Sequence, residues 1–136
     1  MIDTNHQEIA KPLAQKIMLF ANKAGDITSH TPELTLHIRN APTDPLHCIY
    51  TLSLAVVLQG AKMLSVENSV LPCSGGQTML TTFDLPVVSH VTEATRHQPF
   101  VAMVLKLDYN LILQTAAELK LPKQSRNETF EPISIH

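Results

Sequence analysis

The stretch from Leu46 to Lys62 reads LHCIYTLSLAVVLQGAK, and its pattern decides the fold class. Residues 46–58 are mostly apolar at successive positions, with several β-branched or aromatic side chains. Such a run is typical of a strand that is buried on both sides, or of one that changes face at a bulge. Gly60 interrupts it, and we expect a bulge or turn there, with Gln59 bonding to local backbone groups.

Further strand-like segments lie on both sides of this stretch. Residues 34–39 and 87–94 alternate apolar and polar side chains, and residues 62–70, 78–83 and 100–107 are rich in strand-forming residues. The segment from Pro72 to Gly76 has the composition of a turn. Short strands repeated about every ten residues, between two terminal helices, predict a β-sandwich or barrel.

Both ends of the strand-rich region show helical periodicity. Residues 5–24 predict a helix whose true start is moved to about Lys11 by Pro12, with its apolar face formed by Ile9, Leu13, Ile17 and Phe20. A second helix is expected over residues 109–121, with Asp108 as its N-cap and Pro122 ending it. Beyond it, Ile133 and Ile135 alternate like the beginning of a strand.

The composition excludes several classes of protein. With 136 residues, 44% hydrophobic and 16% charged, the chain is long and apolar enough to form one domain with a real core. Its net charge is −2 and its ten Lys and Arg are scattered, so the chain alone is a poor nucleic-acid binder. We find no apolar run of signal-peptide or membrane-span length, and therefore expect a cytoplasmic protein without membrane contact.

Two cysteines are present, and in a reduced cytosolic protein we expect both thiols to be free. Cys48 lies in the apolar run and is predicted to be a small core residue. Cys73 is followed by Ser74 and Gly75, so we expect it near a turn and more accessible.

The sequence offers no strong signal for catalysis or metal binding. Seven histidines are present, but none are paired at the spacing of a metal site, and a site built from His37, His47 and His90 is less favoured than ordinary surface or strand positions. The glycines of Ser74-Gly75-Gly76 belong neither to a nucleophile elbow nor to a phosphate-binding loop. We therefore predict no catalytic residue, no metal and no cofactor.

The central stretch resembles the N-terminal domain of one subfamily of AraC-type transcription regulators. That domain typically reads C-L-Y-x-P-S-L-x-x-x-x-Q-G-x-K, which Cys48-Ile49-Tyr50, Ser53-Leu54 and Gln59-Gly60-Ala61-Lys62 follow here, with Leu52 at the place of the proline. Further pieces follow in the family's order, namely Asp84-Leu85-Pro86-Val87, Glu93-Ala94, Pro99-Phe100 and Leu105-x-Leu107-Asp108. The resemblance spans about residues 31–121. The segment from Val66 to Ser74 departs from it, because the family's usual glycine is missing there.

This resemblance implies a cupin-like double-stranded β-helix, that is, a jelly-roll barrel. We expect an N-terminal helix and linker over residues 1–30, the barrel over 31–108, a helix packing on the barrel over 109–122, and a tail over 123–136 that begins a longer, truncated chain. The helix-turn-helix domain of the family is not expected within this sequence, so DNA would be bound only through that missing C-terminal domain.

The function implied is sensing of a small-molecule effector, or dimerisation, for a transcription regulator. The candidates for the ligand pocket are Tyr50, Leu52, Leu54, Gln59, His90 and Met103, and those for a homodimer contact are Leu111, Ile112, Thr115 and Leu119. Lys62 is expected to pair with an acid or to be exposed. Two alternatives remain open: a metal-dependent small cupin enzyme, and a ligand-free structural dimerisation module.

Overall fold

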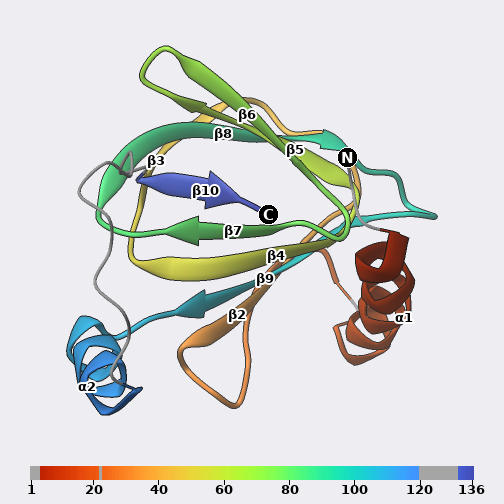
Figure 1. Cartoon of the computed structure of the whole chain (residues 1–136). Helices are drawn as coiled ribbons and strands as arrows, with labels where there is room; N and C mark the ends of the chain where they lie inside the picture. Colours follow the sequence, from red (N-terminus) through yellow and green to blue (C-terminus); the bar gives the residue numbers. More distant parts are fainter. Residues whose placement is uncertain (1–3, 22, 120–131) are drawn as a thin grey trace.

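The computed structural model describes residues 4–21, 23–119 and 132–136. In this part of the chain, ten strands form two antiparallel sheets that face each other, and two helices lie outside them (Figure 1). The prediction of a mainly β protein with flanking helices is confirmed.

The strand order identifies the barrel. One sheet has the order β1 (Gly25–Thr28), β2 (Leu34–Arg39), β9 (Phe100–Lys106), β4 (Ser53–Gln59), β7 (Thr78–Thr81), β10 (Ile133–Ile135). The other has the order β3 (Leu46–Tyr50), β8 (Leu85–Glu93), β5 (Ala61–Val66), β6 (Ser69–Ser74). For the eight strands β2 to β9, this interleaving of early with late strands is the jelly-roll order. The predicted cupin-like double-stranded β-helix is therefore confirmed, with β1 and β10 added at opposite edges of one sheet.

The apolar run over residues 46–58 holds two strands and not one. β3 ends at Tyr50 and β4 begins at Ser53, and the two strands belong to different sheets. On β4, the side chains of one face enter the barrel interior and those of the other face pack toward α1, whereas Leu46 and Ile49 on β3 are exposed. The prediction of a strand buried on both sides therefore holds for β4, which also carries a register shift near its end, and the part that was not predicted is the corner between β3 and β4.

The Gln59-Gly60 pair makes the predicted irregularity. The register of β4 against β9 shifts between Val57 and Gln59, and Gly60 has φ +80°. A Cβ at Gly60 would lie 2.5 Å from the carbonyl oxygen of Glu93, so only glycine fits this position without movement. The Gln59 side chain donates to the carbonyl of Pro99 at 2.8 Å, which is distant in sequence and not local as we expected.

The N-terminal helix α1 (Thr4–Phe20) begins earlier than predicted and runs through Pro12. The expected late start is wrong, because Pro12 lies on the exposed face, where water can bond the carbonyl group that loses its helical partner. The predicted apolar face is also wrong in part, since Ile9 and Phe20 are exposed. The buried face consists of Ala10, Ala14, Ile17 and, just beyond the helix, Ala21.

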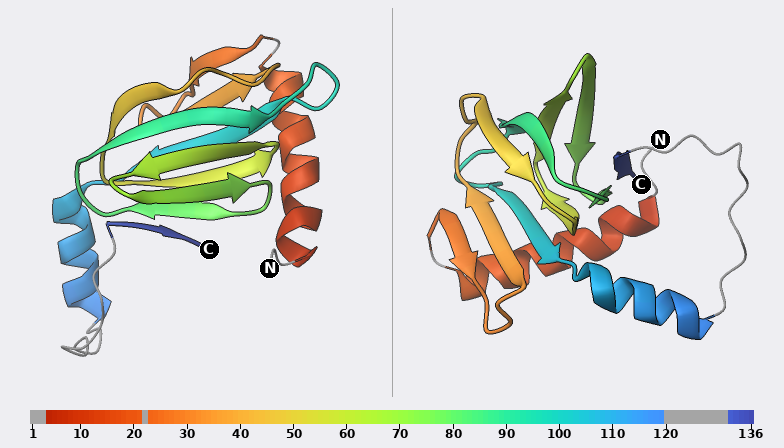
Figure 2. Two further views of the ribbon diagram at one scale, coloured as in Figure 1. Left: turned by 90° about the horizontal axis from the view of Figure 1, so that it is seen from above. Right: turned by 90° about the vertical axis from the view of Figure 1, so that its left-hand side faces the viewer.

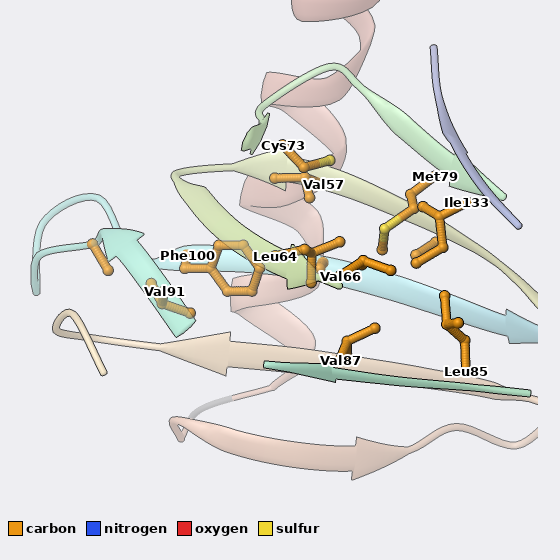
Figure 3. Packing of buried hydrophobic residues seen from close by; sticks show 13 residues of the cluster. Val57, Leu64, Val66, Cys73, Met79, Leu85, Val87, Val91, Phe100 and Ile133 are labelled. Atoms are coloured by element: carbon orange, nitrogen blue, oxygen red, sulfur yellow. The ribbon is translucent and has the colours of Figure 1, made fainter. Parts of the chain in front are cut away.

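Two apolar clusters stabilise this arrangement. The larger one fills part of the barrel, with Leu64, Val57, Met79 and Phe100 among its buried members (Figure 3). The second lies between α1 and the outer face of the larger sheet, where small alanines let the helix approach Leu36, Ile38 and Val101 (Figure 2). The larger sheet is therefore covered on both faces.

The segment around Pro72 is a strand and not the predicted turn. β6 is the edge strand of its sheet, where a proline that cannot donate to the ladder is tolerated. Cys73 on this strand is fully buried, whereas Cys48 is only half-buried, which reverses our prediction for the two cysteines. Both thiols are free, as expected.

The secondary structure at the two chain ends differs in detail from the one predicted from the sequence. β1 was not predicted and pairs with β2, whereas the strand expected at Ile133 and Ile135 is confirmed as β10, paired with β7. Helix α2 (Tyr109–Leu119) has the predicted N-cap, since the Asp108 carboxylate accepts from the Leu111 amide at 3.1 Å. None of the described residues of α2 is buried, and its predicted end at Pro122, like most of the 123–136 tail, lies outside the described residues.

Neither α1 nor α2, as far as the chain is described, has the length and apolar character that crossing a membrane requires.

Candidate ligand-binding cavity

A cavity of about 710 Å³ lies between the two sheets. Its lining includes side chains of β2, β9, β4 and β7 from the larger sheet, and of β3, β5 and β8 from the smaller one. This volume lies within the range of pockets that enclose drug-sized ligands.

Strand alternation decides which side chains reach the cavity. On β2, Thr35, His37 and Arg39 line it, whereas Leu36 and Ile38 are buried in the cluster under α1. Successive side chains of a strand point to opposite faces, so the polar members of β2 share the inner face.

Small side chains leave the interior open. Ser53 and Ala55 on β4 and Ala102 on β9 line the cavity at positions that are almost fully buried. The neighbouring Phe100 and Val104 complete an apolar wall. Since neither Ala55 nor Ala102 carries more than a methyl group, the barrel is not filled by its own side chains here.

The opposite wall holds a polar chain of three side chains. Tyr50 on β3 donates from its hydroxyl to Ser89 Oγ on β8 at 3.1 Å. Lys62 on β5 donates from Nζ to the same Tyr50 hydroxyl at 3.2 Å, and its Nζ lies 5.3 Å from the centroid of the tyrosine ring. All three residues line the cavity. This chain presents one positive charge and hydroxyl groups to an otherwise largely apolar space.

A second polar cluster lies where β1 and β2 border the cavity. Asp26 Oδ1 is 2.7 Å from Arg39 Nη2 and 2.8 Å from His37 Nδ1, and His37 Nε2 is 2.9 Å from Thr35 Oγ1. Partial burial would raise the pKa of Asp26, but the hydrogen bonds and positive charge of Arg39 and His37 outweigh it and lower that pKa overall. Asp26 is therefore ionised at neutral pH and balances the charge of Arg39.

The two thiols lie near Lys62 but are not activated by it. Burial raises the pKa of both Cys48 and Cys73, and the positive charge of Lys62 offsets only part of that increase. Both side chains are thus protonated at neutral pH and act as small packing groups.

The structure places the predicted pocket residues in two groups. Tyr50 and His90 line the cavity. The other four, which are not among the lining residues, are Leu52, Leu54, Gln59 and Met103.

Their positions follow from the strands that carry them. Met103 packs in the cluster under α1, and Leu54 alternates with the lining residues Ser53 and Ala55, so both belong to the outer face of their sheet. Leu52 lies at the corner between β3 and β4, and the Gln59 amide is held by Pro99.

Lys62 is the lining residue that the sequence reading placed incorrectly. It is 9% exposed, and among the described residues no carboxylate forms an ion pair with it, so it is neither exposed nor paired with an acid as we expected. The signal was present in the alternation of β5, since Lys62 shares a face with the buried Leu64 and Val66.

The four residues predicted for a dimer contact lie on α2. Leu111, Ile112, Thr115 and Leu119 are all exposed, and the first, third and fourth are spaced by four residues along one helical face. The hydroxyl of Thr115 donates to the carbonyl of Leu111 within the helix. No side chain of this chain covers these positions in the described structure.

Comparison with protein families decides what the barrel is. Residues 30–135 match the family described as AraC-type transcriptional regulator N-terminus. The chain belongs to that family. The match covers the whole jelly roll from β2 to β9, and confirms the resemblance drawn from the central stretch.

Two other comparisons place this AraC-type domain against curated proteins and against solved structures. A search of curated proteins finds no match. Among solved structures, the domain is similar to a cupin-2 domain-containing protein from Shewanella frigidimarina NCIMB 400, with a TM-score of 0.41 and 11% identity over 70% of this chain and 92% of that one.

The described part of the AraC-type domain contains no group of three or more His, Cys, Asp or Glu side chains arranged to hold a metal ion. His37 and His90 both line the cavity, but His37 is bonded to Asp26 and Thr35. His47 borders a separate, smaller surface pocket. The three histidines weighed as a metal site are thus not brought together.

Proposed function

We propose that this domain senses a small organic effector, which it binds in the cavity between its sheets on behalf of a transcription regulator. In this proposal it is not an enzyme, and DNA is bound by another domain of the same regulator. Effector binding changes the regulator only if it favours one of two arrangements of the barrel and its partners.

The cavity is the observation that carries the proposal. A purely structural barrel gains stability by filling its interior with side chains, yet here alanines and a serine occupy buried positions around about 710 Å³ of space. A mostly apolar enclosure with a few polar groups converging on it is typical of a small-molecule site. The regulator family supplies a role for such a ligand as a signal.

We further propose that α2 forms a homodimer contact. An amphipathic helix with its apolar residues exposed offers a surface that a symmetric copy can cover. Leu111→Glu places a charge on that face, and we expect it to convert a dimer to a monomer in size-exclusion chromatography with light scattering. Asn110→Glu, one residue earlier and off that face, is the matched control. A monomeric wild type, or a dimer that tolerates Leu111→Glu, would refute this contact.

A thermal-shift screen tests the sensing function. The domain is heated with members of a library of metabolites and metal ions, and a ligand at a hundred times its Kd adds about 2.7 kcal/mol to the folded state. For a domain of this size, that raises the Tm by several degrees. We expect an organic metabolite to produce this shift.

Two variants place the ligand. Val104→Phe fills the cavity from β9 and should abolish the shift, whereas Met103→Leu, on the opposite face of the same strand, should leave it unchanged. A shift produced by a transition metal would favour the alternative of a metal-dependent cupin enzyme. A domain that no compound stabilises would favour the ligand-free dimerisation module.

A further inference from the structure

Lys62 is a buried cation in the wall of the cavity. Its neighbours in the β5 ladders are Val91 on one side and Cys73 on the other, neither of which is charged at neutral pH. Among the described residues, its ammonium group has one hydrogen-bond partner, the hydroxyl of Tyr50, and no carboxylate within 4.0 Å. A buried ammonium group without a counter-charge is costly, because it loses hydration that nothing else replaces.

The hydrogen-bond inventory of this wall shows what kind of group would satisfy it. An ammonium group has three N–H donors, and Lys62 uses one of them on Tyr50. The Tyr50 hydroxyl accepts from Lys62 and uses its one hydrogen on Ser89. The hydroxyl of Ser89 accepts from Tyr50, and its own hydrogen has no partner among the described residues. Three hydrogens, two on the Lys62 ammonium group and one on Ser89, are thus left on this wall, and together with the positive charge of Lys62 they favour an acceptor that carries negative charge.

The charges around the cavity indicate that the ligand carries a single negative charge. Arg39 is balanced by Asp26. The remaining charged lining residues, Glu33, Asp44 and Lys106, are exposed, so water and salt screen them. Lys62 is therefore the unbalanced charge that a ligand inside the barrel meets at short range. A carboxylate matches it, whereas a doubly charged phosphate would leave an excess of negative charge in an apolar space.

We propose that the effector is an organic monocarboxylate. Its carboxylate accepts hydrogen bonds from Lys62 and Ser89, and its hydrocarbon part lies against Ala55, Ala102 and Val104 on the facing wall. This inference rests on the proposed sensing function and names the chemical class of its ligand.

The test compares acids with their neutral amides. The probes are a panel of short, medium-chain, branched and aromatic monocarboxylates, including octanoate and phenylacetate, each paired with its primary amide and titrated calorimetrically into the domain. We expect at least one acid to bind about tenfold or more tightly than its amide, because hydrogen bonds to charged groups are stronger than neutral ones.

Variants assign that preference to one residue. Lys62→Met removes the charge but keeps the length of the side chain, and should weaken binding of the acid by on the order of ten- to a hundredfold while hardly changing the amide. Lys62→Arg keeps the charge and should retain part of the preference. Lys16→Met removes an exposed charge on α1 and should change neither affinity. If Lys62→Met fails to fold, the comparison of acid with amide on the wild type still decides.

The outcomes separate this inference from the sensing function. If acids and amides bind equally, or if only neutral metabolites bind and Val104→Phe abolishes their binding, the carboxylate inference is overturned and the sensing function stands. If no acid of the panel binds while the thermal-shift screen finds another ligand, the result is the same. If nothing binds in either experiment, both are overturned.

Discussion

Gly60→Ala tests whether the junction between β4 and β5 holds the barrel as described. Gly60 has φ +80°, a conformation that costs an alanine about 1–2 kcal/mol. The new Cβ would also lie 2.5 Å from the carbonyl oxygen of Glu93 and 3.0 Å from Cα of Phe100. Both are backbone atoms that cannot rotate away, so the strands must shift, at a cost of about 1–3 kcal/mol. The free energy of unfolding should therefore fall by about 2–5 kcal/mol.

Gly25→Ala is the matched control. Gly25 also has a positive φ, +133°, but nothing lies within 4 Å of its added Cβ. It should lose only the contribution of the strained backbone, about 1–3 kcal/mol, with no added steric cost. Urea unfolding followed by circular dichroism measures both variants, and the Tm should fall by roughly 3 °C per kcal/mol. Equal losses for the two variants, or a smaller loss at Gly60, would refute the close packing of this junction against Glu93 and Phe100.

Two further predictions concern the borders of the cavity. Because the pKa of Asp26 is lowered below its ordinary value of 3.8 in the folded state, its pairing with Arg39 and His37 stabilises the fold above about pH 4, and this contribution is lost as the pH falls through the lowered pKa. Asp26→Asn should thus cost no more than about 1 kcal/mol at pH 7, with the difference from wild type shrinking in acid; a constant difference from pH 7 to pH 2 in urea titrations would contradict it. Cys48, which is half-buried and lines the cavity, should be alkylated by iodoacetamide slowly but faster than the fully buried Cys73, and a bound effector should protect it. Mass spectrometry of the modified peptides measures both rates, and faster labelling of Cys73 would show that the burial assigned here is wrong.

Much of the fold was predictable, because strand patterns and short motifs carry local information. The alternation of residues 34–39 and the motif around Gly60 led to the right architecture. What failed depended on contacts between distant segments. Residues 46–58 carry no turn signal at Thr51, and only the second sheet shows why the chain bends there. The buried face of α1 was predicted only at Ile17, since its other buried positions are alanines, which carry little hydrophobic signal in the sequence.

The cavity was less predictable than the fold. The family motif pointed to Tyr50. Ser89 and Lys62 were not predicted for the site, because they reach it only through the pairing of β8 with β5 in the folded sheet. From the sequence we expected Lys62 to be exposed or paired with an acid. Its position two residues before Leu64 on the same strand already placed it on the inner face. Leu54 and Met103 were proposed because they are apolar and central, but alternation places them on the outer face. The cavity exists because Ala55 and Ala102 have small side chains on the inner face of the barrel. The sequence shows two alanines, but it does not show that both face the space inside a barrel.

The proposed sensing function is tested most directly by locating the bound effector. Nuclear Overhauser contacts between the bound ligand and the methyl groups of the domain, measured on methyl-labelled protein with the best ligand of the screen, give its position. We predict contacts to Ala55, Ala102 and Val104, which line the cavity. Contacts confined to the methyl groups of Leu111 and Leu119 on α2, or to the α1 face of the larger sheet, would contradict it.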